Sequence, residues 1–290
     1  MAESIELLTY LNGRIMPHSQ ASPLLQRING ASIGGFYDAE RTFGGEVFKL
    51  RSHLERLYRG LEASSIDPQI SIEELERITL GVIEANLSLL PNGHEYIVTQ
   101  IVNQSQRRSP DDTGTINVVV YCQPLDFTRF ARSYIDGVRI VTPNTYGIPS
   151  GQEPGDSKDG SQQVFLLMAS PNGGVSECEG ANFMFVKNGR IKLPDRRNVL
   201  PGVSMQTVLE LADSLNFPVD EGTYTQRDIY AAGEAFVSST RYCILPVATL
   251  NGLPVGDGIP GKATTALLES WSAAVGIDLV NQALSHLPPA

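Results

Sequence analysis

Residues 37–57, YDAERTFGGEVFKLRSHLERL, decide the fold of this chain because their hydrophobic period changes halfway along. The first half, around the pair Gly44-Gly45, is typical of a β-hairpin. From Arg51 onward the apolar residues recur three and four positions apart, at Leu54, Leu57, Tyr58 and Leu61. This spacing places an apolar stripe on one face of a helix. A hairpin that runs directly into an amphipathic helix predicts a mixed α/β (α+β) domain.

The flanking sequence extends this domain in both directions. Residues 7–15, LLTYLNGRI, form two apolar runs around Asn12-Gly13 and predict an earlier hairpin. Ser71, with Glu74 three positions later, forms a capping box before an amphipathic helix over 74–90. Strands are predicted over 95–102 and 115–125. We therefore expect a small N-terminal domain over 1–123 and an interdomain link over 124–134.

The remaining residues, 135–290, predict a larger C-terminal domain of strands and helices. Residues 137–148 form a strand, and they lead into a Gly-, Pro- and Ser-rich stretch, 149–162, which is the place to look for function. Further elements are predicted as strands over 163–169, 181–186, 190–193 and the two halves of 234–247, and as helices over 203–217 and 263–276.

Composition excludes several classes of function. The net charge is −10 and no run of Lys or Arg occurs that could neutralise a row of phosphates, so nucleic acid is not an expected partner. No stretch of eighteen apolar residues and no basic leader is present, which predicts a cytoplasmic protein without a membrane span. Cys122, Cys178 and Cys243 are expected as buried, reduced thiols. No histidine pairs with a Cys or carboxylate at ligand spacing, so no metal site is expected.

Five segments in order resemble the class IV, pyridoxal-phosphate-dependent aminotransferases. They are LNGR, the stretch 37–57, VSECEGANFMFV, LPGVS and EAFVSSTRYCILPV. The likeness covers nearly the whole chain. The family includes the branched-chain and D-amino-acid aminotransferases, and the chain is most similar overall to the branched-chain-type aminotransferases and amine transaminases. The likeness implies a two-domain fold, pyridoxal 5′-phosphate as the cofactor, and a homodimer.

The resemblance assigns the phosphate of the cofactor to residues in three segments. A dianionic phosphate needs fixed hydrogen-bond donors and positive charge, and the family pattern places Arg56 there, although a solvated helix arginine is the alternative. A helix that starts near Ser204 would aim its positive end at the anion, and Ser204 can equally serve as a plain N-cap. The remaining implied contacts are Gly202, Val203, Ser239 and Thr240.

The resemblance also implies a carboxylate beside the pyridine nitrogen, because such a carboxylate keeps that nitrogen protonated. The family motif is a Glu followed five positions later by Asn, which selects Glu177 with Asn182. Glu179 is the alternative if the register slips by two, since both side chains share one face while the segment stays extended.

A lysine must hold the cofactor covalently and carry a proton in the reaction, and the resemblance places this role on Lys158. The sequence departs from the family here. Lys158 and Glu177 are 19 positions apart, and about three or four turns of helix that relatives have after the lysine are missing. Lys158 instead stands close to Asp156 and Asp159 in a segment typical of an exposed turn, which would keep its amine charged.

The implied reaction is exchange of an amino group between a small-molecule amino acid (branched-chain-like) or amine and a 2-oxo acid. Candidate substrate residues are Tyr37, Arg41 and Thr42, together with Arg241 and Tyr242. An arginine could clamp a substrate carboxylate, although Arg41 could instead pair with Glu40 or Glu46. The alternatives are an impaired homologue that binds cofactor or ligand without turnover, and an aminodeoxychorismate-lyase-like enzyme that releases pyruvate.

Overall fold

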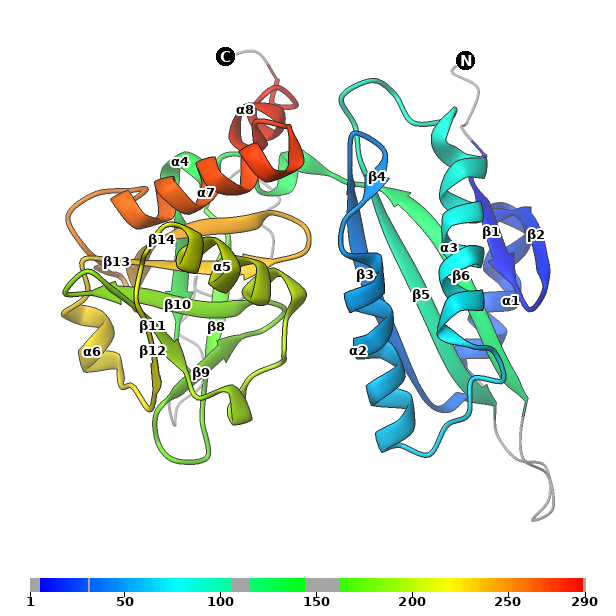
Figure 1. Cartoon of the computed structure of the whole chain (residues 1–290), viewed down its shortest axis with the longest axis horizontal. Helices are drawn as coiled ribbons and strands as arrows, with labels where there is room; N and C mark the ends of the chain where they lie inside the picture. Colours follow the sequence, from blue (N-terminus) through cyan, green and yellow to red (C-terminus); the bar gives the residue numbers. More distant parts are fainter. Residues whose placement is uncertain (1–5, 31, 106–114, 144–161, 289–290) are drawn as a thin grey trace. The chain divides into compact units, whose positions relative to one another are not determined.

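A computed structural model describes residues 6–30, 32–105, 115–143 and 162–288, and the chain divides into two compact units. Unit 1 covers residues 1–125 and unit 2 covers residues 126–290. Each unit contains its own β-sheet with helices packed against it (Figure 1). The mixed α/β class predicted from the sequence is confirmed.

The described part of unit 1 contains a six-stranded antiparallel sheet in the order β2-β1-β6-β5-β3-β4. The strands are β1 (Leu8–Leu11), β2 (Arg14–Pro17), β3 (Ser32–Phe43), β4 (Glu46–Val47), β5 (Tyr96–Ser105) and β6 (Ile116–Pro124), and the helices are α1 (His18–Gly30), α2 (Leu50–Ala63) and α3 (Ile72–Leu87).

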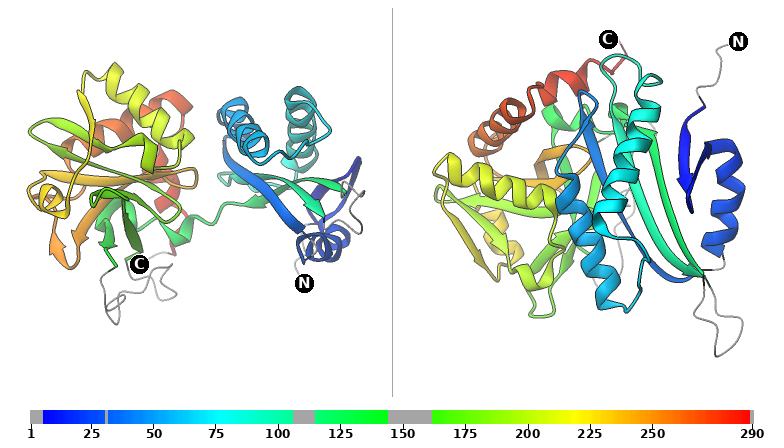
Figure 2. Two further views of the ribbon diagram at one scale, coloured as in Figure 1. Left: turned by 90° about the horizontal axis from the view of Figure 1, so that it is seen from below. Right: turned by 45° about the vertical axis from the view of Figure 1, so that its right-hand side comes forward.

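The core of unit 1 lies between the sheet and α2 with α3, whereas α1 lies on the opposite face (Figure 2). The apolar stripe of α2, formed by Leu50, Leu54, Leu57 and Leu61, is fully buried. Burial of each such side chain stabilises the fold by about 1.5–3 kcal/mol, so this stripe fixes α2 on the sheet. The docking of α2 in turn fixes the polar residues that the helix carries beside the stripe.

Local signals in unit 1 act as the sequence predicts. Asn12 and Gly13 both have positive φ, at 47° and 89°, and join β1 to β2. The side chain of Ser71 accepts a hydrogen bond from the Glu74 amide at 3.2 Å and begins α3. The helix α1 was not predicted from the sequence, and Pro23 lies inside it.

The described part of unit 2 contains a nine-stranded mixed sheet in the order β12-β11-β10-β13-β14-β7-β8-β9, with β15 paired to β14. Its strands are β7 (Val138–Val141), β8 (Val164–Ala169), β9 (Val175–Cys178), β10 (Asn182–Lys187), β11 (Arg190–Pro194), β12 (Val219–Gly222), β13 (Glu234–Ser239), β14 (Cys243–Leu250) and β15 (Leu253–Pro254). Its helices are η1 (Phe127–Arg129), α4 (Ser133–Asp136), η2 (Arg196–Asn198), α5 (Val203–Ser214), α6 (Gln226–Tyr230), α7 (Lys262–Val275) and α8 (Leu279–Leu284).

Residues 126–136, which the sequence analysis placed largely in an interdomain link, are packed into unit 2. The side chains of Phe127 and Phe130 are buried there, and the ring of Phe127 stacks on His286 at 4.3 Å between centroids. The Tyr134 hydroxyl donates to the Tyr242 carbonyl at 2.6 Å. This segment therefore forms part of the wall of unit 2.

Two further observations bear on the expected character of the protein. Cys122, Cys178 and Cys243 are buried and free of disulfides, as predicted. Among the described residues, none of the helices has the length and apolar content that a membrane crossing requires.

Candidate functional site

The centre of the candidate site in unit 2 is the amide side chain of Asn182, at the start of β10. Its nitrogen donates to Glu177 Oε2 at 3.0 Å and to the Leu200 carbonyl at 2.9 Å. The Leu200 amide donates to the same Glu177 oxygen at 2.9 Å. Gly202 approaches so closely that a Cβ there would lie 2.1 Å from Asn182 Oδ1. Glu177, Asn182, Leu200 and Gly202 therefore meet in one cluster. All four lie in the segments VSECEGANFMFV and LPGVS that the sequence analysis selected.

The geometry separates Glu177 from its alternative, Glu179. The strand β9 ends at Cys178, and the chain turns through Gly180, which has a φ of 74°. Glu179 is exposed in that turn, whereas Glu177 is half-buried and held by Asn182. The two side chains would share a face only if the segment stayed extended, and the chain turns here instead.

The Glu177 carboxyl lacks a cationic partner among the described contacts of unit 2. Burial raises the pKa of Glu177, and the hydrogen bond from the Leu200 amide only partly offsets this effect. A positively charged hydrogen-bond donor placed against this carboxyl would lower the pKa again and would be stabilised by it. The Glu177 carboxyl is therefore suited to a protonated ring nitrogen.

The start of α5 supplies anion-binding groups next to Asn182. The helix begins at Val203, and its N-cap, Gly202, provides no side-chain hydrogen bond to the first amides. The first amide groups of a helix have no partners within the helix, and they carry partial positive charge. Ser204 stands within the first turn, so the alternative that Ser204 is itself the N-cap is wrong.

The strand β13 brings the second predicted phosphate segment to the same cluster. Ser238 is paired with Asn182 across the sheet, so the two side chains lie on one face. The Ser238 hydroxyl is buried and makes no hydrogen bond within the described part of the chain. Ser239 and Thr240 follow at the turn into β14 and are half-buried. A buried hydroxyl without a partner is costly, and a ligand oxygen or a water molecule would satisfy it.

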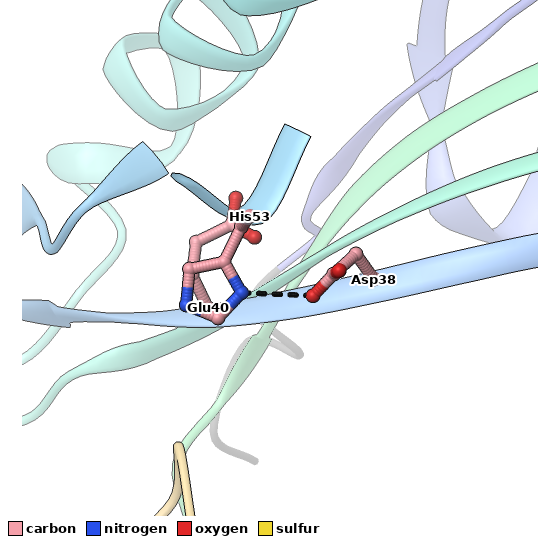
Figure 3. Close-up of side chains that lie close together, drawn as sticks. All are labelled: Asp38, Glu40 and His53. Carbon is pink, nitrogen blue, oxygen red and sulfur yellow. Dashed lines mark hydrogen bonds and ion pairs between the residues drawn. The ribbon is translucent and has the colours of Figure 1, made fainter. Parts of the chain in front are cut away.

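Arg56, the predicted phosphate residue of unit 1, belongs to a buried ion-pair network. Its Nε donates to Asp38 Oδ2 at 2.7 Å and its Nη2 to Asp38 Oδ1 at 2.5 Å. His53 Nδ1 lies 2.8 Å from the same Oδ1 (Figure 3). Burial alone would raise the pKa of Asp38, but the hydrogen bonds from His53 and Arg56 outweigh it and lower that pKa. Burial lowers the pKa of His53, so the ring is a neutral Nδ1–H donor.

Glu40 shares the buried face of β3 with Asp38 but forms no ion pair with any residue that the structure describes. Burial raises its pKa well above the ordinary range, and the Asp38 charge adds to the shift. The Gln100 amide donates to Glu40 Oε1, while Glu40 Oε2 has no hydrogen-bond partner among the described residues. Burial therefore favours the protonated form of Glu40.

The sequence analysis expected no metal site because no histidine pairs with a Cys or carboxylate at ligand spacing. The fold nevertheless brings two carboxylates, Asp38 and Glu40, to His53. Possible ligand atoms of Asp38, Glu40 and His53 lie within 4.8 Å of one another (Figure 3). Both Asp38 oxygens, however, already accept hydrogen bonds from Arg56. A metal ion would have to displace that guanidinium, so the arrangement is better suited to ion pairing.

Of the predicted substrate residues of unit 1, Tyr37 and Arg41 lie on the face of β3 opposite Asp38 and Glu40. Tyr37 is 74% exposed, and the Arg41 guanidinium lies 4.2 Å from the centre of the Phe43 ring. Because side chains alternate along a strand, Arg41 points away from its neighbour Glu40 and cannot pair with it. Thr42 is on the buried face, where its hydroxyl donates to Glu95 at 2.7 Å.

A cavity of about 290 Å³ in unit 2 contains the predicted substrate residues Arg241 and Tyr242. It is lined by Asp126, Arg129, Phe130, Gln163, Phe165, Gly180, Ser239, Arg241 and Tyr242. Ser239 and Gly180 connect the cavity to the Asn182 cluster, because Ser239 follows Ser238 and Gly180 lies in the turn between Glu177 and Asn182.

A model of the class IV aminotransferases matches residues 157–250, which contain Glu177, Asn182 and the predicted phosphate contacts of unit 2. Over these residues the chain is similar to the class IV aminotransferases. The D-alanine aminotransferase of Listeria monocytogenes serotype 1/2a is 26% identical over 243 residues, covering 80% of this chain and 84% of the relative. A putative branched-chain-amino-acid aminotransferase of Methanocaldococcus jannaschii is 26% identical over 286 residues, covering 90% and 94%.

Solved structures show the same fold as this chain. The branched-chain amino acid aminotransferase of Escherichia coli matches with a TM-score of 0.76 at 20% identity, covering 93% of this chain and 94% of that chain. The branched-chain amino acid aminotransferase of T.th., solved with pyridoxamine 5′-phosphate, matches with a TM-score of 0.76 at 18% identity, covering 93% and 95%.

Lys158 lies outside the described residues, although it falls within the stretch that the family model matches. Sequence reasoning missed Asp38, His53 and Ser238. A signal for the first two was present, since His53 and Arg56 are three residues apart on one helix face and Asp38 is at an alternating position of the preceding strand. No local pattern distinguishes Ser238 from Ser239.

Proposed function

We propose that this chain binds pyridoxal 5′-phosphate and moves an amino group between an amino acid or amine and a 2-oxo acid. The observation that carries the proposal is the Asn182 cluster, in which a carboxyl without a cationic partner stands next to an uncapped helix start. The two ends of the cofactor, a ring nitrogen that takes a proton and a phosphate, require these two features.

The residues of the cluster fit the group for physical reasons. The raised pKa of Glu177 makes its carboxyl a strong acceptor for a protonated nitrogen. The first amides of α5, the Ser204 hydroxyl and the turn at Ser239 and Thr240 offer donors to a phosphate. The close approach of Gly202 to Asn182 keeps this helix start beside Glu177.

Pyridoxal phosphate supplies an electron-withdrawing ring that acidifies the hydrogen on the amino-bearing carbon of the substrate. Glu177 would hold a proton at the ring nitrogen, and Asn182 orients the Glu177 carboxyl through its 3.0 Å hydrogen bond. Lys158 would carry the proton to and from the substrate carbon. Arg56, which Asp38 holds in a fixed orientation, would contribute positive charge for the phosphate.

The relatives support an amino acid substrate, because their names include D-alanine and branched-chain-amino-acid aminotransferases. A branched-chain-like substrate, a homodimer and a cytoplasmic location stay predictions of the sequence.

The test is addition of pyridoxal 5′-phosphate to the full chain, followed by borohydride reduction and mass-spectrometric mapping of the modified lysine. We expect the modification on Lys158 and its loss in Lys158→Ala. Lys262→Ala is the matched control, since Lys262 is exposed at the start of α7 and the variant should be modified as the wild type is.

The outcomes separate the proposal from its alternatives. Cofactor-dependent absorbance without any modified lysine would indicate a homologue that binds the cofactor without turnover. Release of pyruvate instead of a new amino acid would indicate an aminodeoxychorismate-lyase-like enzyme. No absorbance change and no selective modification would contradict the proposal.

A further inference from the structure

The core of unit 1 contains two polar side chains that lie against each other, Glu40 on β3 and Gln100 on β5. Neither has any exposed surface. Within the part of the chain that the structure describes, Glu40 Oε2 and Gln100 Oε1 have no hydrogen-bond partner. A buried oxygen without a donor is costly, and nearly all such atoms in folded proteins are satisfied. Two of them in side chains that touch are best explained by one donor that serves both.

A second contact fixes the orientation of the Gln100 amide. Its nitrogen donates to Glu40 Oε1 and to Thr79 Oγ1 of α3, the latter at 3.4 Å. The Thr79 hydroxyl uses its only hydrogen to donate to the Leu75 carbonyl at 2.8 Å, so toward Gln100 it can only accept. The end of the amide that faces both Thr79 and Glu40 Oε1 is therefore the nitrogen, and Gln100 Oε1 is the end that needs a donor.

The sheet register explains why the two side chains meet. Gln100 is paired with Asp38 across β3 and β5, and Glu40 is paired with Val98. Residues two apart in a strand share a face, so all four side chains lie on the face that α2 and α3 cover. Glu40 and Gln100 are diagonal neighbours on this face, a separation that long side chains bridge.

The charged groups of β3 and α2 that border Glu40 are already paired with one another. Asp38, two residues before Glu40, accepts hydrogen bonds from Nε and Nη2 of Arg56, and His53 Nδ1 lies 2.8 Å from Asp38 Oδ1 (Figure 3). His53 is the titratable residue on the buried face of α2. The cationic group nearest to Glu40 is therefore bound to another carboxylate.

The other elements around Glu40 supply neutral groups. On β6, the Cys122 thiol interacts electrostatically with Glu40, and burial raises the pKa of Cys122 to about 12. On β5, the Tyr96 hydroxyl donates to the Asn86 carbonyl at 2.9 Å, and burial raises the pKa of Tyr96 to about 12. The buried face of α3 contains no titratable side chain. These surroundings favour a proton on Glu40 over an ionised carboxylate.

We propose that Glu40 carries a proton in the folded protein and donates it from Oε2 to Gln100 Oε1, and we name this pair of residues the acid–amide lock. The carboxyl and the amide then form a ring of two hydrogen bonds, in which each group donates once and accepts once. The ring continues through Thr79 to the Leu75 carbonyl, so it connects β3 and β5 to α3. One hydrogen atom satisfies both of the oxygens that otherwise have no partner.

The acid–amide lock makes the packing of unit 1 sensitive to pH. Burial raises the pKa of Glu40 well above its ordinary value, the hydrogen bond from Gln100 only partly offsets this effect, and the charge of Asp38 adds to it. Protonated Glu40 therefore stabilises unit 1 fully below its ordinary pKa of 4.5, and this contribution is lost as the pH rises through the raised value. Loss of the proton removes the donor to Gln100 Oε1 and places a second negative charge beside Asp38.

Isotope-edited infrared spectroscopy of the full chain, with labelled glutamate side-chain carboxyls, detects the proton directly. At about pH 6, glutamates with the ordinary pKa of 4.5 are ionised, so a carboxylic-acid carbonyl band reports a retained proton. We expect such a band in the wild type and its decrease in Glu40→Gln. Glu84→Gln is the matched control, because it changes an exposed glutamate of α3 and should leave the band unchanged. Absence of the band, or a band that Glu40→Gln leaves unchanged, would overturn the proposal.

Gln100→Met tests the partner of the proton. Loss of the amide should shift the frequency of the Glu40 band, and an unshifted band would refute Gln100 as the acceptor. Glu40→Met and Gln100→Met each leave one polar group without its partner and should lower the midpoint of urea unfolding. The double variant removes both groups and should recover at least about half of the summed loss. Losses that add fully would show that the two residues do not act as a pair.

Hydrogen exchange at the amide of Thr79, which is buried in α3, measures the opening of the acid–amide lock. Between about pH 4 and pH 8, protection of this amide should fall about tenfold more in the wild type than in Glu40→Gln, which keeps a donor and an acceptor at every pH. An equal fall in both proteins would contradict a pH-sensitive lock. These measurements need no cofactor, so their outcome does not depend on whether the chain binds pyridoxal 5′-phosphate.

Discussion

Two carboxyl groups, Asp38 in unit 1 and Glu177 in unit 2, have pKa values that are shifted in opposite directions. Asp38 is enclosed by its own cationic and polar partners, Arg56 and His53, and its pKa is lowered. Glu177 accepts only neutral amide donors, and its pKa is raised by burial. The Asp38 network contains its own cation, whereas none of the residues that the structure describes supplies a cation to Glu177.

The largest expected effect is loss of the Asp38 network. Asp38→Asn should lower the free energy of unfolding by about 3–5 kcal/mol at neutral pH, because it leaves the Arg56 charge half-enclosed without its carboxylate. Urea denaturation measures this change. The loss should shrink below pH 3.8, where the carboxyl of the unfolded chain is protonated.

Asp136→Asn is the control for Asp38→Asn, since it removes a surface ion pair with Arg132 and should cost less than about 1 kcal/mol. A similar small loss for both variants would show that the Asp38 network contributes no more than a surface pair.

The second effect concerns the packing that keeps the Glu177 cluster together. Gly202→Ala places a Cβ 2.1 Å from Asn182 Oδ1, so either the Asn182 side chain or the start of α5 has to move. We expect a loss of about 1–3 kcal/mol in the free energy of unfolding and weaker binding of pyridoxal 5′-phosphate. In contrast, Gly81→Ala, where the new Cβ meets no atom within 4 Å, should be neutral or stabilising. Equal behaviour of the two variants would contradict a close-packed cluster.

The third effect is on binding alone. Glu177→Gln keeps the hydrogen-bonding shape but removes the negative charge, so the affinity for pyridoxal 5′-phosphate should fall about tenfold, or about 1.4 kcal/mol, with little change in stability. Spectroscopic titration measures the affinity. Glu179→Gln, at the exposed turn, should bind as the wild type does. If only Glu179→Gln lowered the affinity for pyridoxal 5′-phosphate, Glu179 and not Glu177 would be the carboxylate beside the ring nitrogen.

The smallest effect is expected at Glu40, a carboxyl of unit 1 that forms no ion pair with any described residue. Because the folded-state pKa of Glu40 is raised, its contribution to stability is fully present below its ordinary pKa of 4.5 and is lost as the pH rises toward the raised value. Glu40→Gln should therefore stabilise the protein by about 1 kcal/mol at pH 8 and have little effect at pH 4. Urea denaturation at both pH values measures this change in the free energy of unfolding. An equal change at both pH values would contradict a raised pKa for Glu40.

The sequence predicts those parts of the fold that depend on local patterns. The Leu stripe of α2, the Asn12-Gly13 turn and the Ser71 cap all act within a few residues, and each was recognised. The helix α1 was missed because its apolar residues are sparse and Pro23 interrupts the pattern. The short strand β12 was missed because its residues, Val219–Gly222, carry little apolar character.

The candidate site was predicted where the family motif fixes a residue, and it could not be predicted where distant segments meet. Glu177 and Asn182 are five residues apart and were selected from the sequence. The contacts of Asn182 with Leu200 and Gly202 depend on how the loop before α5 returns to β10. The pairing of Asp38 with Arg56 likewise depends on the docking of α2 against β3.

The hydrogen bond from the Leu200 amide to Glu177 makes one backbone proton a reporter of the charge at the candidate site. Its donor belongs to a residue whose side chain is 54% exposed, so solvent reaches its surroundings, while its acceptor is the carboxyl itself. Hydrogen exchange at this amide should slow when a cation holds Glu177 in its ionised form, and it should quicken when Glu177 is protonated. Ligand occupancy of this site could thus be followed by amide exchange, without a chromophore and without turnover.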